Sequence, residues 1–296
     1  MRLLREQGVV GSNPIPPTIS TQTDSIRCAG FSQGTCLSVR NRCSKKCSSV
    51  SLKTPPRALT SDVPIAGSLA SLPALRARGR RVAKILARVY GSPNHNNKQD
   101  PLDELVFIIL SQMTTSPSFE RVYSRLRETA PGWEDVLKMP LNTLKAVIRD
   151  AGLSNQKAPR LKAIFKRLKK DFGAVTLEPL HGMKTLDAEN YLISLPGVQR
   201  KTAKCVLMYS LNRAVLPVDT HVLRVSRRLG LTTAKTIGDE AHSSLERVIS
   251  ARHRYGFHVN AIAHGRAVCL AKAPQCESCL LKDICPYPKA LSHPRL

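Results

Sequence analysis

Two short stretches of this 296-residue chain combine side chains that could do chemistry. The first, LPGVQRKTAKCVL at residues 195–207, joins a Pro-Gly turn to three cations, and an aspartate follows in PVDTH at Asp219. The second, CLAKAPQCESCLLKDIC at residues 269–285, holds four cysteines spaced C-x6-C-x2-C-x5-C. The first stretch offers an amine and a carboxylate beside an anion-binding turn, and the second offers a metal centre.

Lys201 lies at the expected start of a helix, where Arg200 and Lys204 are its neighbours. Like charges and the helix dipole both disfavour an ammonium there, so the sequence predicts a depressed pKa for Lys201. Such an amine could act as a nucleophile and form a Schiff base. The alternative is a solvated lysine that binds phosphate.

Asp219 directly precedes the next expected helix and is a good N-cap residue. A carboxylate held at a helix start is also rigid, so it could stabilise a developing sugar cation or orient water. These structural and catalytic interpretations are compatible.

The Pro196-Gly197 turn connects two expected helices so tightly that backbone N–H groups should point outward as an anion cradle. An ordinary corner between two helices would have the same local sequence. The adjoining cations favour a phosphate contact.

Four thiolates within seventeen residues can surround one metal centre, and by chemistry alone both structural zinc and a 4Fe–4S cluster fit Cys269, Cys276, Cys279 and Cys285. Four further cysteines lie in the N-terminal tract without this spacing, and Cys205 is expected in the core.

The charge of the chain points to a polyanion. There are 46 Lys and Arg against 21 Asp and Glu, a net charge of +25, and the pI is about 10.2. Aromatic residues make up only 4%, which argues against a platform for stacking single-stranded bases and favours duplex DNA. The longest apolar run, Leu105–Leu110, is too short to span a bilayer, so no membrane partner is expected.

Composition divides the chain near residue 72. Residues 1–71 are rich in Ser, Thr, Pro and Gly, and are expected to be a disordered basic segment, whether an organelle transit peptide or the product of a mis-chosen start codon. Beyond them, amphipathic segments closed by Pro, Gly or polar caps predict an all-α fold of about ten helices.

Several motifs together resemble the endonuclease III-like helix–hairpin–helix DNA glycosylases, which have a Gly/Pro-rich loop and an Asp. These motifs are LPGVQRKTAKCVL followed by PVDTH, the HGRAVC sequence before the cysteines, and the cysteine spacing itself. The resemblance covers about residues 75–287. It implies that Lys201 is the Schiff-base nucleophile, that Asp219 is its catalytic partner, and that the four cysteines hold a 4Fe–4S cluster.

The same resemblance implies how DNA is engaged. IILSQMTT assigns Gln112, and GLSNQKA assigns Leu153, to the space that a flipped nucleotide leaves. The remaining expected DNA contacts are Gly197, Gln199, Arg200, Lys204 and Arg266. Two positions depart from the family pattern: Gln199 replaces the second hairpin glycine, and Thr115 replaces an aspartate near the pocket.

The resemblance implies two lobes: a helical barrel over 102–218 with the hairpin, and a discontinuous lobe of 72–101 plus 219–296 with the cluster loop 269–285. The expected function is a base-excision glycosylase and abasic-site lyase acting on an oxidised pyrimidine. The alternatives are a monofunctional mismatch or modified-base glycosylase, and a metal-stabilised DNA-binding protein without activity. We expect a monomer located with DNA inside the cell, in the cytoplasm or nucleoid, or in the nucleus or an organelle of a eukaryote.

Overall fold

The computed structural model describes residues 70–91, 93, 97–114, 116–233 and 235–288. Within these ranges the chain is all-helical and has no strand, as the sequence predicted. The α-helices are α1 Leu72–Tyr90, α2 Pro101–Ser111, α3 Ser116–Thr129, α4 Trp133–Lys138, α5 Leu141–Val147, α6 Ser154–Phe172, α7 Thr185–Ser194, α8 Arg200–Tyr209, α9 Thr220–Arg228, α10 Gly238–Val248 and α11 Arg254–Ala267. Short 3₁₀ turns lie at Arg149–Ala151, Glu178–Gly182, Ala251–His253 and Lys282–Ile284.

Local sequence signals explain where the helices begin and end. The side chain of Asp100 accepts hydrogen bonds from the backbone N–H groups of Leu102 and Asp103, and Pro101 occupies the first turn of α2. Gly91 ends α1 with a φ of 63°, a left-handed conformation that glycine adopts without strain. These ends are therefore determined locally.

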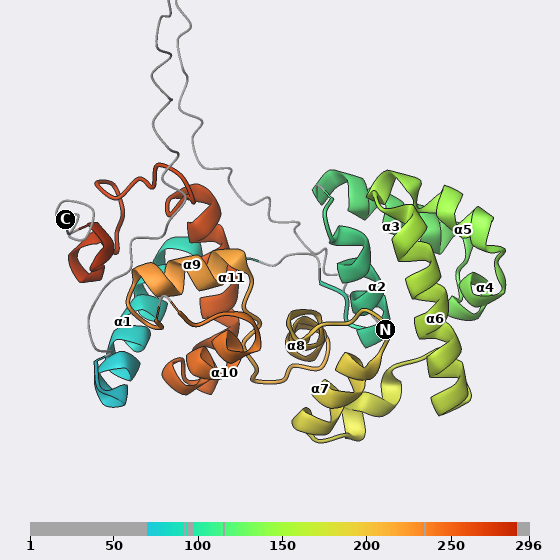
Figure 1. Ribbon diagram of the computed structural model, residues 1–296, viewed down its shortest axis with the longest axis horizontal. Helices are drawn as coiled ribbons and strands as arrows, with labels where there is room; N and C mark the ends of the chain where they lie inside the picture. Colours follow the sequence, from blue (N-terminus) through green and yellow to red (C-terminus); the bar gives the residue numbers. More distant parts are fainter. Residues whose placement is uncertain (1–69, 92, 94–96, 115, 234, 289–296) are drawn as a thin grey trace, which may run out of the picture. The chain divides into compact units, whose positions relative to one another are not determined.

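The helices surround two hydrophobic clusters. One is built from buried residues between Leu102 and Val215, and the other from residues 75–86 together with residues between Leu216 and Leu281. Both belong to one compact unit of the chain. Figure 1 shows α1, α9, α10 and α11 grouped around the second cluster, with α2 to α8 on the other side.

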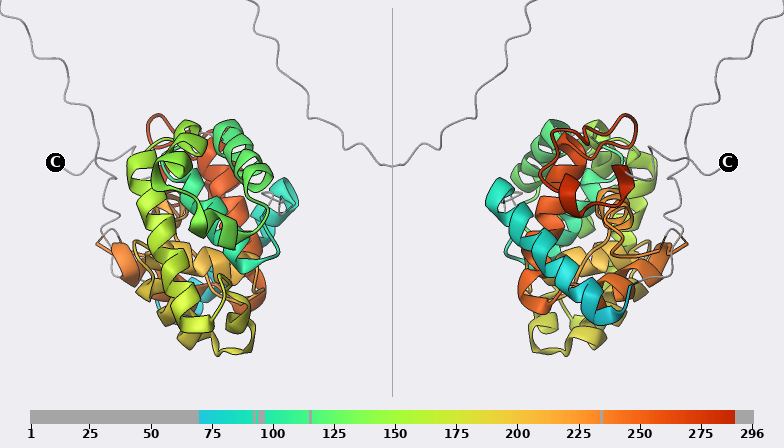
Figure 2. Two further views of the ribbon diagram at one scale, coloured as in Figure 1. Left: turned by 90° about the vertical axis from the view of Figure 1, so that its right-hand side faces the viewer. Right: turned by 90° about the vertical axis from the view of Figure 1, so that its left-hand side faces the viewer.

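Residues 283–286, near the end of the described chain, lie against α1 (Figure 2). Arg78 and Arg81 of α1 line the same surface depression as Asp283 and Cys285. The first and last segments of the second cluster in sequence, α1 and residues 283–286, therefore lie side by side.

Several sequence predictions fall outside the described residues: the disordered segment over 1–71 as far as residue 69, its cysteines Cys28, Cys36, Cys43 and Cys47, and Thr115. Among the helices that are described, none is both long and apolar enough to cross a membrane.

Candidate functional site

The hairpin between α7 and α8 has the predicted tight turn. Gly197 adopts a φ of 70°, and a Cβ atom there would lie 2.4 Å from Nε of Arg160 on α6. The left-handed backbone conformation favours glycine at this position, and any other side chain would also have to displace Arg160. Gln199 is exposed and has a φ of −94°, which any residue can adopt. The hairpin therefore forms without a second glycine.

Lys201 and Asp219 line one cavity of about 450 Å³. Lys201 lies in the first turn of α8, and Asp219 is the N-cap of α9, where its Oδ1 accepts a hydrogen bond from the backbone N–H of Val222 at 2.7 Å. The helix start holds this carboxylate rigidly. Eighteen positions apart in the chain, the amine and the carboxylate thus reach the same cavity.

The pKa of Lys201 is raised above the ordinary value of a lysine, contrary to the sequence prediction. Negative charge on Cys205, Asp219 and Glu104 near the ammonium outweighs its desolvation. The prediction was wrong because it counted only the neighbouring cations. It left out Cys205, one turn further along α8, which makes the largest contribution, and the carboxyl groups of Asp219 and Glu104.

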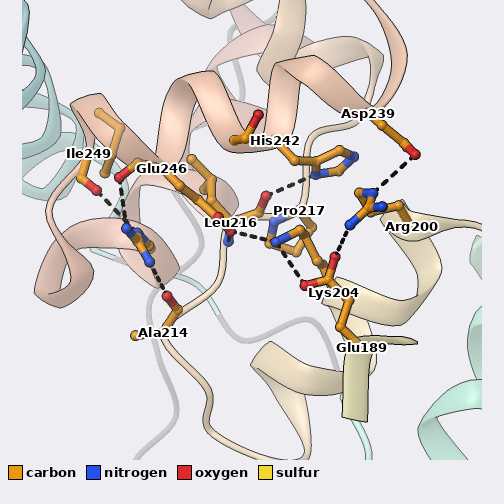
Figure 3. Close-up of polar contacts among 12 residues, drawn as sticks. Glu189, Arg200, Lys204, Ala214, Leu216, Pro217, Asp239, His242, Glu246 and Ile249 are labelled. Carbon is orange, nitrogen blue, oxygen red and sulfur yellow. Dashed lines mark hydrogen bonds and ion pairs between the residues drawn. The ribbon is translucent and has the colours of Figure 1, made fainter. Parts of the chain in front are cut away.

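Arg200 and Lys204 form a network of ion pairs with acidic residues (Figure 3). Arg200 contacts Oε1 of Glu189 at 2.5 Å and Oδ2 of Asp239 at 3.1 Å. Nζ of Lys204 lies 3.2 Å from Oε2 of Glu189 and 2.7 Å from Oε1 of Glu246. Glu189 belongs to α7, the first helix of the hairpin, whereas Asp239 and Glu246 come from α10, which is distant in sequence.

Lys204 is only 4% exposed. A side chain that is buried and paired with two carboxylates cannot also reach a phosphate, so the predicted DNA contact at Lys204 is wrong. Arg200 keeps partial exposure, but its guanidinium group is bound to two acids. The only cation of this predicted trio that faces the cavity is Lys201.

Glu104 of α2 is a cavity residue that the sequence analysis missed. It is 1% exposed, and its carboxylate accepts hydrogen bonds from the Lys98 backbone N–H at 2.7 Å and from Nδ2 of Asn97 at 3.4 Å. Burial raises its pKa to about 7. An acidic residue on a largely apolar helix, DPLDELVFIIL, was the available signal.

Arg266, predicted as a DNA contact, is exposed on α11 and lines the same cavity as Lys201. Gly265 before it allows α11 to approach α9 closely, because a Cβ there would lie 3.0 Å from Cβ of His221. The HGR sequence therefore places a cation at the edge of the cavity by means of tight helix packing.

Gln112 and Leu153 lie on neighbouring loops. Gln112 ends α2, and its Oε1 accepts a hydrogen bond from Nη1 of Arg160 at 3.1 Å. Leu153 precedes α6 with a φ of 51° and is 46% exposed, so its side chain is largely outside the core. A buried lysine, Lys157, joins the two loops by donating to the carbonyl groups of Gln112 and Ala151, each at 2.7 Å.

The four cysteines of the predicted cluster loop line a single small cavity. None of them is in a disulfide. Across the described residues no three His, Cys, Asp or Glu side chains are arranged around one ion. A 4Fe–4S cluster does not require that arrangement, because each cysteine binds a different iron.

Donors around the thiols suit such a cluster. Nη1 of Arg228 lies 3.3 Å from Sγ of Cys269, and the backbone N–H of Leu281 lies 3.4 Å from Sγ of Cys279. N–H groups directed at sulfur stabilise thiolate charge and tune a cluster. The side chains present therefore fit the implied group.

The sequence profile described as HhH-GPD superfamily base excision DNA repair protein matches residues 106–250. Endonuclease III of Thermotoga maritima is 30% identical over 195 residues, which are 66% of this chain and 87% of that protein. A protein of Arabidopsis thaliana, provisionally named a DNA glycosylase, is 33% identical over 173 residues, 58% of this chain and 59% of its own length.

The structure described as a trapped endonuclease III–DNA covalent intermediate matches with a TM-score of 0.63 and 28% identity, covering 73% of this chain and 98% of that one. The chain belongs to the HhH-GPD superfamily of base excision DNA repair proteins, among the endonuclease III-like DNA glycosylases.

Proposed function

We propose that this protein is a bifunctional glycosylase and abasic-site lyase that flips a damaged base, an oxidised pyrimidine, out of duplex DNA. The observation that carries the proposal is the shared cavity of Lys201 and Asp219, with Arg266 at its edge. The similarity to a structure described as a trapped covalent complex of endonuclease III with DNA supports a covalent mechanism.

In the proposed reaction the amine of Lys201 attacks the anomeric carbon of the flipped nucleotide. A nitrogen–carbon bond forms, the glycosidic bond breaks, and the base leaves with the bonding electrons. The bond between C1′ and the ring oxygen then breaks. The oxygen keeps the bonding electrons, takes up a proton and remains on C4′ as a hydroxyl, while the nitrogen, having lost one proton, forms the C=N bond of a protonated imine, which permits β-elimination 3′ to the lesion. Asp219 stabilises the positive charge that develops on the sugar.

Because the pKa of Lys201 is raised, the resting side chain is an ammonium and must lose a proton before it attacks. Asp219 and Glu104 are the carboxyl groups that line the cavity near it, together with Glu120. Glu104 is suited to accept a proton, since its pKa of about 7 allows both forms at neutral pH.

We also propose that the two hydrophobic clusters are the cores of two lobes, residues 102–218 and residues 72–101 plus 219–296. Cys269, Cys276, Cys279 and Cys285 would hold a 4Fe–4S cluster that cross-links loop 269–285 of the second lobe. When bound, this group would supply covalent cross-links within the loop rather than a step of base removal. A protein acting on duplex DNA would be located with DNA inside the cell, and we propose that it acts as a monomer.

Borohydride trapping on duplexes that carry an abasic site tests the lyase proposal, because reduction converts the imine into a stable protein–DNA adduct. The wild type and Lys184→Gln, an exposed lysine at the start of α7, should form the adduct. Lys201→Gln should not, while it keeps salt-sensitive DNA binding. An undiminished adduct in Lys201→Gln would show that another amine attacks.

The raised pKa of Lys201 supports a second candidate, a monofunctional glycosylase in which Asp219 orients a water molecule. A panel of duplexes carrying oxidised pyrimidines, uracil, T·G mismatches or 5-methylcytosine separates the two. Base release without an adduct or strand cleavage would support the second candidate. The duplex processed fastest would identify the base.

A further inference from the structure

Met113 is the most exposed large apolar side chain among the described residues, and its place in the proposed reaction is unassigned. It is 87% exposed, directly follows Gln112, and has a φ of 56°. A left-handed backbone is strained for methionine, and exposing this side chain to water forgoes its burial. Both costs indicate that the side chain has a partner outside the folded chain.

Leu153 has the same two properties on the adjacent loop, with 46% exposure and a φ of 51°. The loops touch: a Cβ on Gly152 would lie 3.8 Å from the carbonyl oxygen of Met113. Two exposed apolar side chains in left-handed backbone thus occupy neighbouring turns. Few non-glycine residues adopt this conformation, and those that do cluster at functional sites. Its occurrence at both Met113 and Leu153 therefore points to a functional role for the two turns.

Lys157 fixes the relative position of the two loops. It is 2% exposed, and its Nζ donates to the carbonyl oxygens of Leu110, Gln112 and Ala151 at 2.7–2.8 Å, and to Oγ1 of Thr114 at 3.1 Å. An ammonium group has three protons, so two of these four acceptors share one of them. The loops are held before any partner binds.

The family resemblance already implies that Leu153 enters the DNA. We infer that Met113 is a second apolar wedge residue beside it, which enters the base stack of duplex DNA where a nucleotide has been flipped out and separates the opposite base from its neighbour. This inference rests on the proposed function. Its partner is the stacked bases of an opened duplex, since apolar side chains inserted between base steps replace lost stacking. Arg160, which contacts Gln112 and the hairpin glycine, supplies a cation beside the wedge.

The test measures binding to two duplexes of the same sequence, one with a tetrahydrofuran abasic analogue and one undamaged, each with 2-aminopurine opposite the site. Met113→Asn and Met113→Ala should bind the abasic duplex about ten-fold more weakly than the wild type, consistent with the loss of one stacking contact. They should also lose the rise in 2-aminopurine fluorescence. Asparagine tolerates the left-handed backbone, so that variant keeps the fold.

Met113→Leu should retain both signals because it restores an apolar side chain of similar size. Ile237→Ala, which removes an exposed apolar side chain from the turn before α10, should behave as the wild type. All variants should bind undamaged duplex alike. Wild-type affinity in Met113→Asn and Met113→Ala, or an equal loss on both duplexes, would refute the wedge. A wild type without preference for the abasic duplex would instead refute the proposed function, and the wedge with it.

Discussion

Nζ of Lys204 lies 2.7 Å from Oε1 of Glu246, and this ion pair joins the second hairpin helix α8 to α10 of the other hydrophobic cluster. The same Glu246 oxygen accepts a hydrogen bond from the backbone N–H of Leu216, also at 2.7 Å. Leu216 is where the chain passes from one cluster to the other. The hairpin is thereby fixed in orientation, with Lys201 directed at the cavity.

We expect Lys204→Met to lower the free energy of unfolding by about 3–5 kcal/mol, because Glu189 and Glu246 would each lose a buried positive partner. Urea denaturation measures this change. Lys184→Met, at an exposed lysine, should change it by less than about 0.5 kcal/mol. A stable Lys204→Met protein with weakened DNA binding would instead restore the phosphate contact predicted from the sequence.

Glu104 should make stability depend on pH. Its pKa is raised from 4.5 to about 7 in the folded protein, so its contribution is complete below pH 4.5 and is lost as the pH rises to about 7. Glu104→Gln should therefore gain stability relative to the wild type by about 3 kcal/mol across this interval. Urea denaturation at pH 5 and pH 8 measures the difference. The control is Glu128→Gln, at an exposed carboxylate, which should show no such trend. If the free energy of unfolding changed with pH equally in the wild type and in Glu104→Gln, the prediction would be contradicted.

Substitutions of Asp219 should separate its capping role from its catalytic role. Asparagine keeps an oxygen for the Val222 N–H, whereas Asp219→Ala should lower the free energy of unfolding by about 1 kcal/mol. Both variants should slow base excision by roughly 100-fold or more, since both remove the charge. Single-turnover excision and thermal melting give the two measurements. Normal excision by Asp219→Asn would exclude a role for the charge.

Leu153→Asn should weaken binding to a duplex with an abasic analogue by about 1–3 kcal/mol, comparable to a lost stacking contact. Its stability should be equal to or above that of the wild type, because asparagine adopts the left-handed backbone at this position more readily than leucine. Fluorescence anisotropy and thermal melting measure the two effects. Leu186→Asn, at an exposed leucine of α7, is the control. A loss of stability without a loss of affinity in Leu153→Asn would mean that Leu153 packs within the protein rather than binding DNA.

The purified protein should contain about four irons and four labile sulfides per chain and be yellow-brown. Cys279→Ser should lose iron and fold poorly, because the loop has few apolar contacts of its own. Cys205→Ser should keep its iron, as Cys205 lies on α8 outside the loop. Elemental analysis and absorption spectra identify the metal centre. One zinc per chain without iron would contradict the assignment of a 4Fe–4S cluster.

The sequence by itself determined the features that depend on nearby residues. Helix ends followed from Asp100, Gly91 and other caps, the hairpin turn from Gly197, and Asp219 as an N-cap from its position before an amphipathic segment. The all-α class also followed from local periodicity. Spacing placed Lys201, Asp219 and the four cysteines in motifs whose family could be named.

Only the tertiary structure decided which charges meet. Lys204 is buried and Lys157 joins two loops because Glu246 and the carbonyl group of Gln112 come from distant segments. At Lys201 the carboxyl groups of Asp219 and Glu104 add to the larger effect of Cys205 on the same helix, and together they raise its pKa. Sequence neighbours predicted repulsion at Lys201 and a phosphate contact at Lys204. Electrostatic energies fall with distance in space and rise in a desolvated interior, so separation along the chain cannot predict them.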